Sequence, residues 1–191
     1  MEELLTAVPG LQALAGGALV AEQVAQIDSK DMDGEVWRTL ALRCAHHLND
    51  SEVRGVVITA GTDTLEETAW FLHEVLDAAK PVVLTCAMRP ATALTPDGPQ
   101  NLLDAVATVL APGATGVLAV AAGEVHGARH VQKVHPYRVN AFSSGDAGPL
   151  GWVEESVVRW ACNSPVVPVK NAVGAMNNIV SAATWPWVEI V

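Results

Sequence analysis

Hydrophobic and polar positions change from one period to another in the first half of the chain. Residues 56–58 form a short β-branched run, and residues 59–64 are small and rich in hydroxyl groups. Apolar residues then recur at i, i+4, i+7 and i+11, namely Leu65, Ala69, Leu72 and Leu76. This succession predicts a buried strand, a polar loop and a helix that begins at Thr64 or Leu65.

The polar loop of this segment is where the sequence predicts chemistry. Thr59, Thr62 and Asp63 fall between the carboxyl end of the expected strand and the amino end of the expected helix. Open α/β sheets bind ligands at such strand ends, and the free N–H groups of a helix start accept anions. Thr64 and Glu67 also have the spacing of a capping box. Because Thr and Asp are common helix caps, a capped turn without a ligand fits this loop equally well.

The chain before this segment predicts two helices and one strand. The apolar spacing favours a helix over residues 2–14, a strand over 18–27 and a further helix over 37–48, which Asp33 would cap. The polar loop after the expected strand contains Ser29. Ser29 is therefore a second candidate site residue at the carboxyl end of a strand.

The chain after this segment continues the alternation of strands and helices. We expect a strand, a loop, a helix and a strand, at residues 81–85, 86–99, 102–110 and 116–121. Short connections between alternating strands and helices are typical of parallel sheets. The sequence therefore predicts an α/β fold, with a mostly parallel, doubly wound sheet flanked by helices in three αβα layers.

The hydrophobic pattern changes again after Gly123. Residues 123–142, which include Lys133, alternate with a period of two and predict extended segments or a hairpin. Residues 152–160 also predict a strand or hairpin, and the last six, 186–191, the opening of another strand.

Composition and charge exclude several classes of partner. A chain of 191 residues can bury one full core. The formal charge of −10, without a basic run, argues against nucleic acid as a partner. No stretch of about 18 apolar residues is present, so we expect no membrane span. The acidic start and three separated cysteines (Cys44, Cys86 and Cys162) favour a cytoplasmic location.

Two further site classes find little support in the sequence. His126, His130 and His135 lie close together, but Gly127 and Pro136 argue against one helical face, and no cysteine or carboxylate cluster completes a ligand set. We therefore expect no metal site. No glycine-rich phosphate-binding motif follows a strand, which argues against a nucleotide-binding domain.

Four short motifs stand in order along the chain. They are SKDM at 29–32, ITAGTDTLEETAWFL at 58–72, AMRP at 87–90 with DGPQNL at 97–102, and ARHVQK at 128–133. They resemble the segments SQDM, THGTDTxEET, AMRP with DGPxNL, and ARxVxK of the bacterial-type L-asparaginase and glutaminase-asparaginase family.

This resemblance implies a fold and an activity. It implies a flavodoxin-like first domain, at residues 1–185 here, and a second domain, of which residues 186–191 would be the start. It also implies a homo-oligomer, either a dimer or a tetramer built from intimate dimers. The implied reaction is hydrolysis of the side-chain amide of asparagine, and often glutamine, to the acid and ammonia without a metal or organic cofactor.

The resemblance also assigns roles to four residues of this chain. Thr62 and Lys133 would form a catalytic pair, in which the lysine favours the deprotonated hydroxyl or water that attacks. Asp63 would bind the α-ammonium group of the amino-acid substrate, and Ser29 its α-carboxylate. The strand and helix pattern independently places Ser29, Thr62 and Asp63 in loops at strand ends.

The sequence departs from the family in several ways. It contains no TGGTI segment, which carries the nucleophilic threonine of the family, and Tyr137 is its only tyrosine. Ala60 stands in place of the histidine of THGTDT, and Lys30 in place of the glutamine of SQDM. We therefore expect an internal portion or a degenerate relative of an asparaginase, with little or no release of ammonia by this chain alone. The alternative is a non-catalytic amino-acid-binding or assembly module that retains Ser29 and Asp63.

Overall fold

The computed structural model describes residues 8–161, 181–182 and 184–185. The first half of the helix expected at 2–14, Cys162 and the strand expected at 186–191 therefore lie outside the described residues. Within the described part, none of the helices combines the length and the hydrophobicity that crossing a membrane requires.

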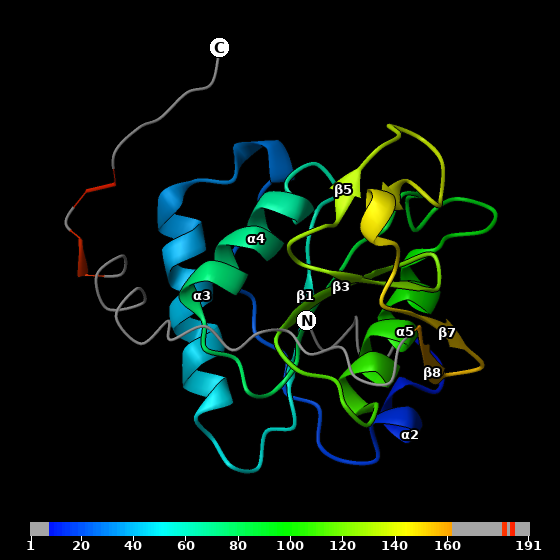
Figure 1. Ribbon diagram of the computed structural model, residues 1–191, viewed down its shortest axis with the longest axis horizontal. Helices are drawn as coiled ribbons and strands as arrows, with labels where there is room; N and C mark the ends of the chain where they lie inside the picture. Colours follow the sequence, from blue (N-terminus) through cyan, green and yellow to red (C-terminus); the bar gives the residue numbers. More distant parts are fainter. Residues whose placement is uncertain (1–7, 162–180, 183, 186–191) are drawn as a thin grey trace.

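A mixed sheet of six strands forms the middle layer (Figure 1). Its strands, in spatial order, are β1 (Val56–Thr59), β2 (Val82–Thr85), β3 (Val117–Ala121), β4 (Glu124–Gly127), β7 (Gly151–Glu154) and β8 (Val157–Trp160). β1, β2 and β3 are parallel, and β4, β7 and β8 continue the sheet in antiparallel pairs. A separate antiparallel ribbon joins β5 (Gln132–Lys133) to β6 (Phe142–Ser143). The extended segments or hairpin expected after Gly123 are thus confirmed, and of the strand or hairpin expected at 152–160 the hairpin is found.

Helices cover both faces of this sheet, so the predicted α/β fold with three layers is confirmed (Figure 1). One face carries α3 (Gly34–Leu48) and α4 (Leu65–Val75), and the other carries α2 (Leu11–Ala15) and α5 (Gly98–Leu110). Two 3-10 helices complete the described elements, η1 (Ser29–Asp31) and η2 (Gly145–Ala147).

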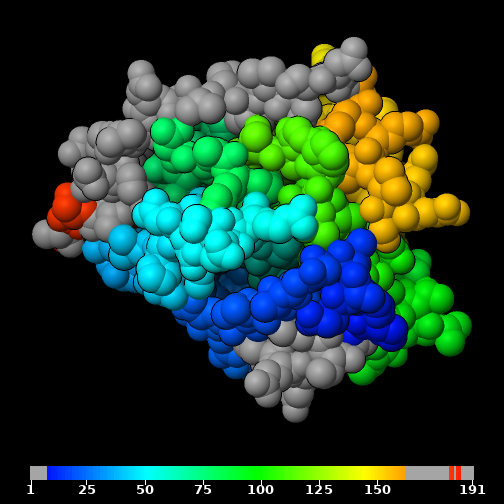
Figure 2. Space-filling view, turned by 90° about the horizontal axis from the view of Figure 1, so that it is seen from below, coloured from blue at the N-terminus to red at the C-terminus, as the bar shows by residue number. Residues whose placement is uncertain are grey.

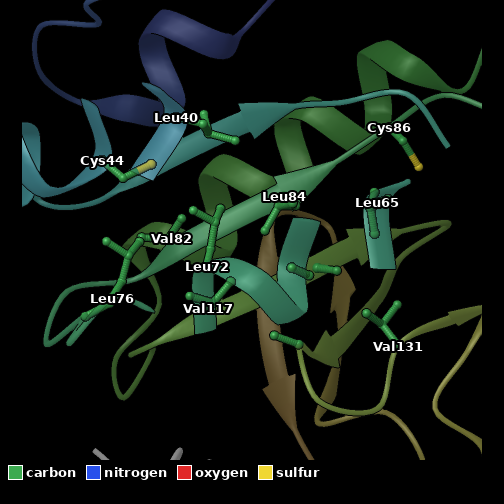
Figure 3. Packing of buried hydrophobic residues seen from close by; sticks show 14 of the residues in the cluster. Leu40, Cys44, Leu65, Leu72, Leu76, Val82, Leu84, Cys86, Val117 and Val131 are labelled. Carbon is green, nitrogen blue, oxygen red and sulfur yellow. The ribbon is translucent and has the colours of Figure 1, made fainter. Parts of the chain in front are cut away.

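The central strands have apolar side chains on both faces because each face meets a layer of helices. In β2, Val82 and Leu84 pack into the cluster under α3 and α4, whereas Val83 packs with residues of α5. All three side chains are fully buried. Figure 3 shows how the first cluster joins side chains of α3, α4, β2 and β3. This double burial explains why the strand sequences are continuous apolar runs.

The prediction of a strand at residues 18–27 is wrong, because this segment has no strand structure. Leu19 packs with the cluster that joins α2 and α5, whereas Val24 packs with the cluster under α3 and α4. The segment therefore passes from one face of the sheet to the other, and Figure 2 shows its blue surface extending toward the cyan surface of α3. Its apolar residues therefore pack into two different hydrophobic clusters and do not form one face of a strand. Val20 remains 85% exposed.

Two helix starts differ from the expected ones. α5 begins at Gly98, four residues earlier than expected, with Pro99 in the first turn. Proline suits this position because its φ is preset for a helix and its missing N–H is not needed there. α2 begins only at Leu11, after Pro9. The cap expected at Asp33 is confirmed, since its side chain accepts a hydrogen bond from the N–H of Val36 at 2.9 Å.

Candidate active site

The loop between β1 and α4 brings the first candidate residues to one end of the sheet. α4 begins at Leu65 with Thr64 as its N-cap residue, as the pattern predicts. The prediction of a capping box at Thr64 and Glu67, however, is wrong. The Thr64 side chain makes no cap hydrogen bond, and its hydroxyl donates to the backbone carbonyl of Ser29 at 3.1 Å. Because the side chain is oriented toward Ser29, it ties two loops together instead of closing its own helix.

Ser29 lies in η1 and joins this loop across 34 positions of sequence. Its side chain is buried, with 8% of the residue exposed, and its Oγ accepts a long hydrogen bond from the N–H of Asp63 at 3.4 Å. Since the oxygen accepts here, the hydroxyl proton of Ser29 can point elsewhere. Both predicted loops are therefore brought together at the carboxyl end of β1.

Lys133 reaches the same loop from β5. Its Nζ donates hydrogen bonds to Thr62 Oγ1 at 2.7 Å and to Asp63 Oδ1 at 2.6 Å. The lysine side chain is 18% exposed, whereas the Asp63 side chain is 55% exposed. All four residues predicted from the sequence thus lie in one cluster, formed by Ser29, Thr62, Asp63 and Lys133.

The geometry of this cluster suits acid–base chemistry on a hydroxyl group. A lysine within hydrogen-bonding distance of a threonine hydroxyl can stabilise its deprotonated form or pass a proton. The carboxylate of Asp63 balances the lysine charge and still faces solvent, so it can also receive a cationic group. Burial of the lysine strengthens both contacts, because water screens them less.

Two residues beside this cluster were not predicted from the sequence. Glu66 accepts a hydrogen bond from the backbone N–H of Lys133 through Oε2. Gly61 lies against Ser29, so that a Cβ at position 61 would stand 2.4 Å from Ser29 Oγ. Both belong to the 58–72 motif, but in the sequence Glu66 resembles any acidic residue of a first helical turn and Gly61 resembles any loop glycine.

The motifs AMRP and DGPQNL also meet near this end of the sheet. The Asp97 carboxylate accepts hydrogen bonds from the N–H groups of Met88 at 2.9 Å and Arg89 at 2.8 Å. Asn101 donates through Nδ2 to the same carboxylate and to the carbonyl of Cys86 at 2.9 Å. These contacts fold the loop after β2 onto the start of α5, so the two motifs form one structural unit.

The histidines are separate from this cluster. His126 is 1% exposed, and its Nδ1 lies 2.9 Å from Ser144 Oγ. Its Nε2 has no hydrogen-bond partner among the residues that the structure describes and lies 3.6 Å from the Glu124 carboxylate. Burial lowers the pKa of His126 to about 4. Among the described residues, no three His, Cys, Asp or Glu side chains come together as metal ligands would.

The described cysteines are buried in the core. Cys44 lies on α3, and Cys86 follows β2. Burial raises the pKa of each thiol to about 12. Both thiols therefore stay protonated at neutral pH, as expected of small hydrophobic core residues.

Comparison with known proteins gives one consistent result. The family model described as Asparaginase, N-terminal, matches residues 1–165. The chain is 41% identical over 162 residues to L-asparaginase 2 of Escherichia coli (strain K12), covering 84% of this chain and 45% of that protein. It is 40% identical over 162 residues to a glutaminase-asparaginase of Pseudomonas fluorescens biotype A, covering 84% of this chain and 44% of that protein.

A solved structure is similar as well. The probable cytoplasmic L-asparaginase from Campylobacter jejuni superposes with a TM-score of 0.81 at 44% sequence identity. The match covers 85% of this chain and 52% of that one. The chain thus spans about half the length of the proteins that it matches.

Proposed function

Because this chain belongs to the asparaginase family, through the N-terminal domain of that family, we propose that its loop cluster serves the hydrolysis of a side-chain amide. The substrate is L-asparagine, with L-glutamine as the longer homologue, and the products are the corresponding acid and ammonia. The observation that carries this proposal is the contact of Lys133 Nζ with both Thr62 and Asp63.

Asp63 and Ser29 bind the α-amino and α-carboxylate groups of the substrate in this proposal. The Asp63 carboxylate is half exposed and can pair with an ammonium group. The Ser29 hydroxyl already accepts the N–H of Asp63, so its proton remains for a carboxylate oxygen. The amino end of α4 lies beside both residues and favours a negatively charged group.

Thr62 and Lys133 carry the chemical step in this proposal. The lysine stabilises the deprotonated oxygen of Thr62, or of a water molecule in its place, as that oxygen attacks the amide carbonyl carbon. The carbon–nitrogen bond then breaks, and the leaving nitrogen takes the proton that the attacking oxygen gave up and departs as ammonia. Where Thr62 is the attacking group, water hydrolyses the resulting ester and restores the hydroxyl.

The assembly and location of the protein are part of the same proposal. The family resemblance supports a homo-oligomer, either a dimer or a tetramer. The similarity to the probable cytoplasmic L-asparaginase of Campylobacter jejuni supports a cytoplasmic location.

A second function is an amino-acid-binding module without turnover. The specific observation in its favour is that Ser29 and Asp63 are hydrogen-bonded to each other within this chain, while the sequence contains no TGGTI segment. Binding of an amino acid through its α-groups does not require an attacking threonine.

Calorimetry and an ammonia assay on the 191-residue protein distinguish the two functions. We expect L-aspartate to bind, and L-asparagine to release ammonia slowly, because only one of the two threonine motifs of the family is present in the sequence. Thr62→Ala should abolish the ammonia and keep the binding of L-aspartate, and Asp63→Ala should abolish both. Thr39→Ala, a change at an exposed threonine of α3, is the matched control.

The outcomes lead to different conclusions. Ammonia release that depends on Thr62 supports the hydrolase. Binding of both amino acids without any ammonia supports the binding module. The absence of binding and of ammonia release, in protein that circular dichroism shows to be folded, overturns both functions.

A further inference from the structure

The short ribbon of β5 and β6 leaves one backbone group of Lys133 free for another partner. Lys133 lies opposite Phe142, and the N–H of Val134 donates to the carbonyl of Ala141 at 2.8 Å. This register makes Lys133 and Phe142 a pair that is not hydrogen-bonded, because in antiparallel ribbons such pairs alternate with bonded ones. The N–H of Lys133 therefore points away from β6.

Glu66 receives this N–H group. Its Oε2 accepts the hydrogen bond, and the carboxylate thereby joins β5 to the first turn of α4. Glu66 follows Asp63 by three positions, so one short stretch of chain holds both the backbone and the Nζ of Lys133. Figure 1 shows β5 beside the amino end of α4.

A second contact holds the same two segments together. The guanidinium of Arg129 lies 5.7 Å from the ring centre of Trp70. Glu66 and Trp70 are four residues apart on α4 and therefore share one face of that helix. Val131, which lies between Arg129 and Lys133 in the sequence, is buried in the core at 3% exposure. The backbone of residues 129–133 is thus aligned along α4, and Glu66 is its last tether before the lysine side chain.

We propose that Glu66 is a positioning residue that fixes the backbone of Lys133, so that Nζ stays between Thr62 and Asp63. A lysine side chain has several rotatable bonds, and holding its backbone limits the space that Nζ can explore. Without Glu66, an N–H group loses a charged acceptor and the short ribbon can move away from α4. The importance of this position for catalysis rests on the proposed hydrolysis, whereas the position itself is measurable without turnover.

Acetylation of Lys133 tests the position directly. The 191-residue protein is treated briefly with an acetylating ester, and the labelling rate of each lysine is read by peptide mass spectrometry. In Glu66→Ala we expect Lys133 to react about tenfold faster than in the unchanged protein, which corresponds to one lost hydrogen bond to a charged acceptor. Glu66→Gln keeps an acceptor oxygen in the same place and should restore most of the protection.

Two controls separate this effect from general loosening. Glu67 is the exposed neighbour on the same helix turn, so Glu67→Gln and Glu67→Ala should leave the labelling of Lys133 unchanged. Lys80, whose Nζ donates to the carbonyl of Asp50, is an internal reference in every sample. Equal labelling of Lys133 in Glu66→Ala and in the unchanged protein overturns the proposal, whatever the ammonia assay shows. Faster labelling of Lys80 as well would also overturn it, since the effect would then be global.

The ammonia assay then tests the catalytic consequence. We expect Glu66→Ala to lower kcat by about tenfold, with KM changed less than about twofold, because Ser29 and Asp63 remain in place. An altered KM with unchanged kcat contradicts a positioning role in the chemical step. If the unchanged protein releases no ammonia while the labelling of Lys133 responds to Glu66, the hydrolase proposal fails and the positioning of Lys133 stands.

Discussion

The backbone of Gly61 lies directly against the side chain of Ser29. A Cβ at position 61 would stand 2.4 Å from both the Cβ and the Oγ of Ser29. Real Cβ atoms do not approach other atoms so closely, and Ser29 itself is buried. The glycine is therefore required for packing between two loops, and the distance between these loops sets the spacing of Ser29 and Asp63.

Gly61→Ala should displace Ser29 and weaken the binding of L-aspartate. We expect a loss of about 1–3 kcal/mol in the free energy of unfolding, because an added methyl group has no space here. Urea unfolding followed by circular dichroism measures this loss. Gly17→Ala is the matched control, since a Cβ there meets no atom of the described residues within 4 Å. The double variant Ser29→Gly with Gly61→Ala should recover stability without recovering binding, and recovery of both would refute this explanation.

Asp97→Ala should loosen the loop between β2 and α5. The substitution leaves the N–H groups of Met88 and Arg89 without their acceptor, so we expect the free energy of unfolding to fall by about 2 kcal/mol. Hydrogen exchange at these two amides measures the local effect. Asp97→Asn retains one acceptor oxygen and should give an intermediate result. Unchanged exchange in Asp97→Ala would show that these hydrogen bonds do not hold the loop.

The buried thiols should resist alkylation in the folded protein. With a pKa of about 12, Cys44 and Cys86 have about one thiolate in ten thousand molecules at pH 8. In the Cys162→Ser variant, iodoacetamide should therefore label the folded chain at least about a hundredfold more slowly than the chain in guanidinium chloride. Rapid labelling of either thiol without denaturant would contradict its burial.

Protonation of His126 should destabilise the fold as the pH falls. Its pKa is about 4 in the folded chain and 6.5 as the ordinary value, so between these values only the unfolded chain binds the proton. Stability is therefore complete above pH 6.5 and falls toward pH 4, by up to about 3 kcal/mol. The nearby Glu124 carboxylate reduces this loss to the extent that it pairs with the charged ring.

His126→Gln isolates this effect from the other histidines. Urea unfolding at pH 7, 6 and 5 should show a smaller decrease in stability for the variant than for the unchanged protein. Parallel curves for the two proteins would show that His126 titrates alike in the folded and unfolded chains, contrary to its burial.

The sequence by itself determined the order of the elements from β1 to β3 and identified the residues of the candidate site. Val56, Val57 and Ile58, followed by the repeat at Leu65, Ala69 and Leu72, encode strand, loop and helix through the spacing of apolar positions. The expectation that this strand is buried is wrong, because β1 lies at the edge of the described sheet and its apolar side chains are only partly buried. Such local periodicity is readable because each side of an element meets either core or solvent. The sequence pattern placed Ser29, Thr62 and Asp63 in loops, and the motif resemblance added Lys133.

Only the tertiary structure decided which groups contact one another. The segment at 18–27 has a strand-like pattern, yet Leu19 and Val24 serve two different cores, because a strand also needs a partner for its backbone hydrogen bonds. The hydroxyl of Thr64 bonds Ser29 instead of capping its own helix. Glu66 likewise bonds an N–H group 67 positions away. Contacts of this kind depend on how segments distant in the sequence meet in space. The local spacing of apolar and polar residues therefore does not predict them.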